Sequence, residues 1–278
     1  MLTPTAEIIA AATAARRGVG AFNVIQLEHA EALAAGAELA NAPVILQISQ
    51  NAVKYHGGNP DPISLATLAV ARASAAKVAV HLDHANDVEL CHRAVELGYS
   101  SIMFDASTLP YAENVAATAE LARYCHDRGV FIEAELGEVG GKDGVHAPGA
   151  RTVPAEAVAF VAATGVDALA VAVGSSHAML TRDAVLDLEL IAKLRAAVPV
   201  PLVLHGSSGV PDELLTAAVE AGMTKINIAT HLNKAFTGAV REYLTENPKV
   251  VDTRKYLAPG RDAVATESAR LLGVLRAS

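Results

Sequence analysis

The chain has 278 residues, 52% of them hydrophobic, and a formal net charge of −8 at pH 7. This length suits one large α/β domain or two small ones and is ample for a sizeable core. The acidic charge argues against binding to nucleic acid, no run reaches the roughly 20 apolar residues of a membrane span, and no secretion signal is recognised at the start.

Eight short apolar runs are predicted to be β-strands, and eight Ala-, Glu- and Leu-rich stretches between them have helical spacing. The strand candidates are 18–24, 43–49, 78–85, 100–106, 130–137, 167–174, 201–208 and 223–230. The helix candidates are 26–41, 61–76, 87–97, 110–128, 154–164, 187–197, 211–221 and 231–246. Eight such units match an α/β fold of the (β/α)8 TIM-barrel type, with a doubly wound open sheet as the runner-up. We expect a single domain over 1–278, with a helical tail over 247–278.

The two cysteines, Cys91 and Cys125, fall in predicted helices and lack the spacing of metal ligands. Free thiols in a reducing compartment are the simplest interpretation. A cytoplasmic location is therefore expected.

Histidines stand at the ends of the third, sixth and seventh predicted strands, where barrel active sites assemble. They are His84, His177 and His205, and His84 directly follows Asp83. One such histidine is more often structural, but three on one rim favour a metal site, since three protein ligands commonly hold a catalytic Zn²⁺. Because neighbours on a strand point to opposite faces, Asp83 and His84 can both turn to the rim only if the strand bends there.

Charged side chains are also predicted inside the barrel. Glu133 and Glu135 share one side of the fifth strand, and Lys225 lies on the eighth. A buried acid needs a partner, so a Lys225–Glu133 ion pair is the plain structural interpretation. Glu135 and Asp105, nearer the rim, are candidates for an alternative metal position. His81 is interpreted as a residue that orients a ligand.

Two segments after the seventh and eighth strands favour a phosphate group. Backbone N–H groups and helix N-termini there can hold a dianion, and these are the strands where barrels frequently do so. The segments are Gly206, Ser207, Ser208 and Gly209, and then Asn227, Ile228, Ala229 and Thr230.

With these residues identified, the chain resembles the class II, metal-dependent ketose-bisphosphate aldolases, the family of the fructose- and tagatose-bisphosphate aldolases. The likeness runs from Ala21 to Leu257 and rests on the motifs HLDHA, EAELGEVGG, AVGSSH, LVLHGSSG and KINIAT. It implies reversible cleavage of a phosphorylated ketose, such as fructose- or tagatose-1,6-bisphosphate, to dihydroxyacetone phosphate and an aldehyde such as glyceraldehyde 3-phosphate.

The resemblance also implies a metal and an acid/base. Asp83 would take the C4 hydroxyl proton during cleavage and return it during condensation. One catalytic Zn²⁺ is expected, while a second metal position and a monovalent cation are left open. The metal residues would be His84, His177 and His205, with Asp105 and Glu135 at the second position.

Further residues correspond to substrate contacts of the family. The dihydroxyacetone-phosphate end would lie against 206–208 and 227–230, with Asn23 and Ser49 nearby. Arg254 would reach the distal phosphate, often across a subunit boundary. Family members are usually dimers or tetramers, so a homodimer or homotetramer is expected.

Departures from the family pattern occur in the loop after two glycines, at Ala178, where tagatose-type members have glycine, and at Ala229. The family has a glutamate in the loop after two glycines, thought to exchange the C3 proton, whereas Asp143 is the only nearby carboxylate here. Ala229 replaces the aspartate of fructose-bisphosphate enzymes and favours the tagatose type or another side branch of the family. The segment 49–55 (SQNAVKY) favours the fructose type, so the sugar stays open.

Other functions remain to be separated from this one. A lysine on a strand also suits a Schiff-base aldolase that uses Lys225 as nucleophile. The altered loop at 140–144 would suit a non-catalytic subunit that binds sugar phosphates or serves assembly. A related aldolase acting on another sugar phosphate is the third alternative.

Overall fold

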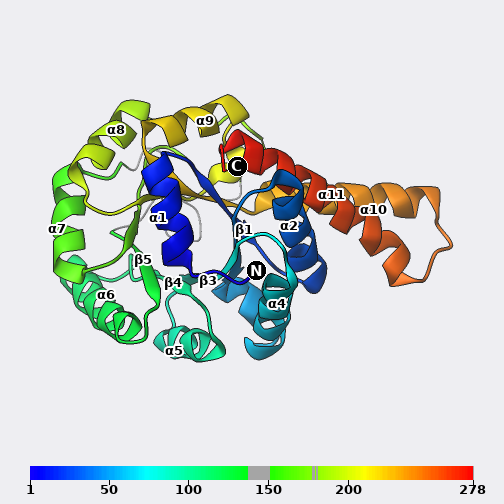
Figure 1. Cartoon of the computed structure of the whole chain (residues 1–278), viewed down its shortest axis with the longest axis horizontal. Helices are drawn as coiled ribbons and strands as arrows, with labels where there is room; N and C mark the ends of the chain where they lie inside the picture. The colour runs from blue at the N-terminus through cyan, green and yellow to red at the C-terminus, as the bar shows by residue number, and fades with distance from the viewer. Residues whose placement is uncertain (137–150, 177–178, 180, 278) are drawn as a thin grey trace.

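The structure is a computed structural model that describes residues 1–136, 151–176, 179 and 181–277. Eight parallel strands close into a barrel in chain order, with β8 paired to β1 (Figure 1). The predicted (β/α)8 barrel is thereby confirmed. The strands are β1 (Val19–Asn23), β2 (Val44–Ser49), β3 (Val78–Ala85), β4 (Ser101–Phe104), β5 (Phe131–Glu135), β6 (Ala168–Ala170), β7 (Leu202–Leu204) and β8 (Met223–Ile228).

Helices surround the barrel, and their bounds lie within a few residues of the predicted ones. The α-helices at the predicted places are α2 (Leu27–Ala40), α4 (Asp61–Ala73), α5 (Val88–Leu97), α6 (Tyr111–His126), α7 (Pro154–Thr164), α8 (Leu188–Ala197), α9 (Asp212–Ala221) and α10 (Thr230–Glu246). Those without a separate prediction are α1 (Thr5–Ala15), α3 (Gln50–Tyr55) and the short 3₁₀ helix η1 (Ser207–Gly209). The predicted tail contains α11 (Thr253–Val274).

Local signals explain several boundaries. Asp87 accepts hydrogen bonds from the first backbone N–H groups of α5, and Gly98 ends that helix with a φ of 96°. Such a left-handed cap satisfies the last carbonyls at little cost only with glycine. Ser49 caps α3 by accepting from Ala52 N, so α3 begins where β2 ends.

The barrel interior changes in character from one end to the other. Helix α1 crosses the end of the barrel where the strands begin (Figure 1). Its apolar side chains pack in the interior there. Ile8, Ile9 and Ala12 pack there against the first residues of the strands, among them Val19 and Ile45. Toward the other end the interior is polar, which leaves that rim for chemistry.

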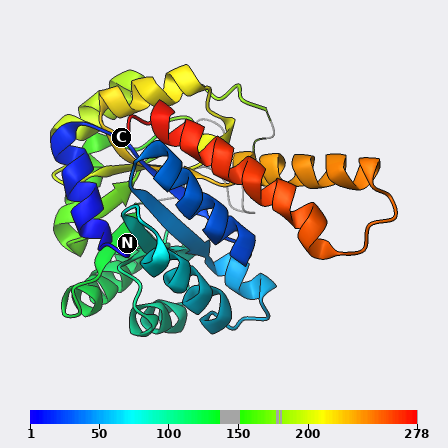
Figure 2. The same cartoon turned by 45° about the vertical axis from the view of Figure 1, so that its right-hand side comes forward.

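Helices α10 and α11 form an arm that extends beyond the barrel (Figures 1 and 2). The later part of α11 returns along α2 and packs closely against it. At Gly36 of α2 an added Cβ would lie only 2.7 Å from Ala265 O of α11, so glycine permits this approach. Among the described residues, no helix is both long and apolar enough to cross a membrane.

Candidate metal centre and active site

A bend at the end of β3 brings two adjacent side chains to the rim. His84 has a φ of 46°, in the left-handed region that residues other than glycine rarely adopt. The β3–β4 register also shifts between Leu82 and Ala85. The bend that the sequence required for Asp83 and His84 is therefore present.

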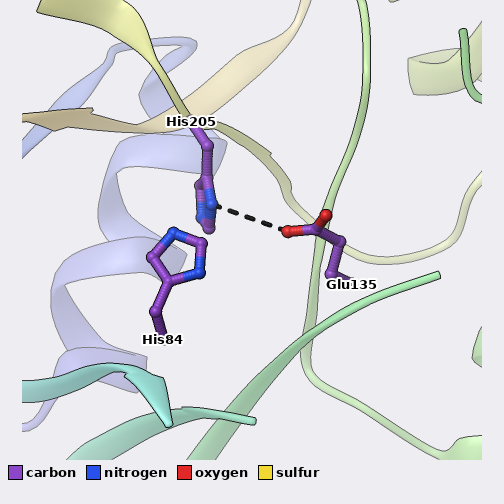
Figure 3. Close-up of side chains that lie close together, drawn as sticks. All are labelled: His84, Glu135 and His205. Atoms are coloured by element: carbon purple, nitrogen blue, oxygen red, sulfur yellow. Dashed lines mark ion pairs between the residues drawn. The ribbon is translucent and has the colours of Figure 1, made fainter. Parts of the chain in front are cut away.

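His84, Glu135 and His205 form the candidate metal site. One potential ligand atom from each lies within 4.8 Å of the other two. The His84 and His205 ring centroids are 4.6 Å apart at 71°, and His205 Nδ1 lies 3.8 Å from Glu135 Oε2 (Figure 3). Two imidazoles and a carboxylate from three separate strand ends are a donor set that fits Zn²⁺.

Two carboxylates fix which nitrogen of each ring faces the site. His84 Nδ1 lies 3.2 Å from Asp105 Oδ2, and His205 Nε2 lies 2.9 Å from Glu133 Oε1. A ligating histidine normally gives its other N–H to such an acceptor. The nitrogens that face the candidate metal site are then His84 Nε2 and His205 Nδ1.

The negative charge of the site acts on His84. Burial by itself would lower the pKa of His84, but Asp83, Asp105 and Glu135 together raise it to about 9. Burial would likewise raise the pKa of Asp105, yet the hydrogen bond with His84 holds it well below its usual value. A site that favours a cation this strongly is suited to a metal ion.

An ion pair lies buried beneath the metal site. Lys225 Nζ is 2.8 Å from Glu133 Oε2, and both side chains are almost fully buried, which confirms the predicted pair. Lys225 is thereby engaged as a counter-ion instead of facing a ketone as a Schiff-base nucleophile would. Burial and the nearby Lys225 hold the pKa of His81 well below its usual range, so this ring is neutral. His81 Nδ1 lies 2.8 Å from Ser101 Oγ.

Asp83 is held by side-chain amides at the mouth of the barrel. Asn23 Nδ2 donates to Asp83 Oδ2 at 3.1 Å, and Asn227 Nδ2 donates to Asp83 Oδ1 at 3.4 Å. Gln47 Nε2 donates in turn to Asn23 Oδ1 at 2.7 Å. Asp83 is only 3% exposed, so these donors replace the water that a carboxylate would otherwise bind.

The two segments predicted to hold phosphate lie side by side; we call residues 206–209 and 227–230 the phosphate cradle. Ala229 N donates to Ser208 Oγ at 3.2 Å, and α10 begins directly after Ala229 without a side-chain cap. Gly206 has a φ of 66°, and an added Cβ there would lie 2.6 Å from the backbone of Ser176. Backbone N–H groups at a helix start beside a glycine turn can bind an anion.

Two of the predicted substrate-contact residues make other contacts in the described structure. The Arg254 side chain is 89% exposed and pairs with Asp252 at 2.8 Å, at the start of α11 in the arm. The Ser49 hydroxyl caps α3, although in register it is opposite Asp83. His177 and Asp143 lie outside the described residues.

Two contacts of the site were not predicted from the sequence. Gln47 was not singled out, although its side chain reaches across from β2 to Asn23 on β1. The link from Glu133 to His205 was also missed. The period-2 spacing of a strand puts Gln47 on the same face of β2 as Ser49, and this could have indicated the Gln47–Asn23 contact. No local pattern indicates the contact of Glu133 on β5 with His205 after β7.

The chain belongs to the class-II fructose-bisphosphate aldolase family, whose model matches residues 3–278. Members of this family are carbon–carbon lyases that cleave a phosphorylated ketose to dihydroxyacetone phosphate and an aldehyde. The fructose-bisphosphate aldolase of Geobacillus stearothermophilus is 40% identical over 97% of this chain and 94% of its own length. That of Streptococcus pyogenes serotype M3 is 40% identical over 88% of each chain. The crystal structure of the YdjI aldolase from Escherichia coli K12 has a TM-score of 0.84 and 30% identity, covering 100% of this chain and 98% of its own.

Proposed function

We propose that this chain is a zinc-dependent aldolase that reversibly cleaves a ketose 1,6-bisphosphate to dihydroxyacetone phosphate and glyceraldehyde 3-phosphate. The observation that supports this most is the meeting of His84, His205 and Glu135 beside an amide-held Asp83. Family membership supports the reaction class, and the donor set supports zinc.

The proposed metal ligands are His84 and His205 together with His177. Glu135 and Asp105 would serve a second or transient metal position. When bound, Zn²⁺ supplies Lewis-acid stabilisation of the negative charge that develops on the ketone oxygen during C3–C4 cleavage. Glu133 keeps His205 in the tautomer that ligates through Nδ1.

Asp83 is the proposed acid/base. Its two oxygens accept from Asn23 and Asn227, so the carboxylate is fixed in orientation and can take a hydroxyl proton and return it in the reverse direction. The phosphate cradle would bind the dihydroxyacetone-phosphate end through backbone N–H groups. We propose Asp143 as the base for C3 proton exchange, in place of the family's glutamate.

Fructose 1,6-bisphosphate is the substrate we propose first. Relatives about 40% identical carry the name fructose-bisphosphate aldolase. Ala229 is the residue that favours tagatose 1,6-bisphosphate instead, so both sugars belong in the assay.

We propose further that residues 1–278 form a single domain that assembles into a homodimer or homotetramer in the cytoplasm. The exposed arm and Arg254 support assembly. The arm extends beyond the barrel, and the exposed Arg254 side chain is accessible to a second chain. Cys91 and Cys125 are buried free thiols, which suits a reducing compartment.

The test is turnover of the purified chain with zinc and after removal of zinc by a chelator. The zinc-loaded chain should cleave fructose 1,6-bisphosphate. This activity should be lost on chelation and regained when Zn²⁺ is added. Tagatose 1,6-bisphosphate and the monophosphates form the comparison panel. Cleavage that survives chelation and is trapped by borohydride would contradict the metal mechanism, and absence of cleavage with tight phosphate binding would favour a binding subunit.

A further inference from the structure

Each half of the phosphate cradle is followed at once by a helix whose first turn carries an ion-pairing residue. Asp212 is the first residue of α9, and His231 is the second residue of α10. Both pair with α11: Arg270 Nη1 lies 2.5 Å from Asp212 Oδ2, and His231 Nε2 lies 2.5 Å from Glu267 Oε1. Glu267 and Arg270 also bind each other through two contacts of 2.7 and 2.8 Å. One turn of α11 therefore connects the two helix starts.

The loop after β6 joins the same network. Arg182 Nη2 lies 2.6 Å from Asp212 Oδ1, and Arg182 Nε donates to Val210 O at 3.0 Å. Ala184 N donates to Gly209 O at 3.0 Å. Arg182 and Ala184 thus contact the segment from Gly209 to Asp212 through an ion pair and through backbone hydrogen bonds.

These contacts are better shielded than ordinary surface ion pairs. The five side chains, those of Arg182, Asp212, Arg270, Glu267 and His231, are only 21–41% exposed. Burial by itself would raise the pKa values of both carboxylates, yet hydrogen bonds from Arg270 and Arg182 to Asp212, and from Arg270 and His231 to Glu267, lower both. Networks with forked arginine contacts hold geometry in a way that isolated exposed pairs do not.

We propose that this bracing network (Arg182, Asp212, Arg270, Glu267 and His231) positions the phosphate cradle and thereby sets the affinity for the phosphate end of the substrate. The proposal rests on the proposed function for the place where phosphate binds. Donors in the cradle are backbone groups from two different loops, so their spacing depends on how α9 and α10 sit relative to each other. The five residues act through that spacing and are positioning residues.

The test compares Glu267→Gln and Arg270→Gln with the matched control Arg276→Gln. Arg276 also joins the end of α11 to α9, through Glu220 at 2.6 Å, but its pair is about 55% exposed and lies at the other end of α9. Inorganic phosphate binding to the zinc-loaded chain is measured by calorimetry, and KM and kcat are measured with fructose 1,6-bisphosphate. Thermal unfolding of each variant verifies folding; Glu267→Gln is nearly isosteric.

We expect the phosphate Kd and the KM to rise about fivefold in Glu267→Gln and in Arg270→Gln, equivalent to about 1 kcal/mol of binding free energy, with kcat unchanged. The double variant should lose little more than either single one, because both act in one network. Arg270→Lys should recover part of the affinity, since it keeps the charge without the fork. Arg276→Gln should bind phosphate like the wild type.

Wild-type affinity in both network variants, an equal loss in Arg276→Gln, or no phosphate binding by the wild-type chain would each overturn the proposal. Phosphate binding is measured without turnover, so the two proposals can fail separately. Network-dependent phosphate binding without cleavage of any ketose overturns the proposed function alone. Cleavage with the same KM in every variant overturns the role of the network alone.

Discussion

Asp83 combines deep burial with hydrogen bonds from two amide donors on neighbouring strands. Replacing it with alanine removes the proposed acid/base but none of the proposed zinc ligands. We expect Asp83→Ala to retain zinc and to lose about 10²- to 10⁴-fold in kcat, the usual contribution of a general acid or base. Metal analysis and cleavage kinetics on the same sample are the measurement. Turnover at the wild-type rate would remove Asp83 from the mechanism.

Glu133 orients His205 and compensates the charge of Lys225 at the same time. Glu133→Met removes both acceptor oxygens, and it should therefore weaken zinc binding by about 10- to 100-fold, as is typical when the partner of a ligating histidine is lost. Competition with a chromophoric chelator measures the affinity. The charge-balanced pair Glu133→Met with Lys225→Met is the matched control.

The double variant separates two effects. It should recover stability, because no buried charge is left uncompensated, but it should not recover zinc affinity. Recovery of full zinc affinity in the double variant would show that Glu133 acts through charge alone and not by orienting His205.

Single residues with unusual roles were only partly predictable. Asp83, His84 and His205 were identified because they end predicted strands, and the need for a bend was deduced from alternation alone. Which nitrogen of His205 faces the site depends on Glu133, a contact across the barrel that no local pattern encodes. The engagement of the Ser49 hydroxyl as a helix cap was hidden for a similar reason, since α3 was not predicted.

Among the elements, those with a clear hydrophobic period were predicted within a few residues. The two α-helices that were not predicted, α1 and α3, depend on features other than hydrophobic periodicity. α1 buries its apolar side chains in the end of the barrel, so its role depends on closure of the sheet. α3 has only six residues and begins without a loop after β2. Both are set by tertiary context more than by periodicity.

The contact between α2 and α11 depends on Gly36. In Gly36→Ala the new methyl group would meet the backbone at Ala265, so the helices must separate and we expect a loss of about 1 to 3 kcal/mol in unfolding free energy. Gly238→Ala in α10 is the matched control, because an added Cβ there has no atom of the described residues within 4 Å. That variant should gain about 0.5 to 1 kcal/mol from helix propensity. Denaturant unfolding measures both, and equal stability of the two variants would contradict the close contact.

The link between α9 and α11 should respond to acid. Asp212 and Glu267 have pKa values lowered from 3.8 and 4.5 when folded, so the unfolded chain binds more protons at low pH. Their contribution to the free energy of unfolding is full above the unfolded-state pKa values and is lost as the pH falls through the lower folded-state values. Unfolding free energy measured from pH 6 to pH 3 should therefore fall more steeply in the wild type than in Arg270→Gln. Equal slopes would contradict the linkage, and added salt should reduce the difference.

At the scale of the whole molecule, the closed barrel was predictable from the count of eight strand–helix units. The direction in which the arm of α10 and α11 extends was not predictable from the sequence. The sequence places Arg254 only within a tail, whereas the structure puts it at the start of α11, exposed and far in sequence from every other site residue. The described chain thus has the candidate metal site of His84, Glu135 and His205 at the rim together with Asp83, while the candidate phosphate-binding Arg254 lies at the start of α11. In the proposed homo-oligomer, Arg254 of a second copy would complete the phosphate-binding site.

Subunit complementation tests this arrangement. Arg254→Ala should raise the KM for a ketose bisphosphate while the isolated chain keeps its zinc and its stability, because the side chain is almost fully exposed. Asp83→Ala should be inactive for a different reason. Mixed oligomers of the two variants should regain activity, since one site then combines an intact Asp83 with Arg254 from the neighbouring chain. Sedimentation confirms that mixed oligomers form; if they form without any regained activity, Arg254 does not act across subunits.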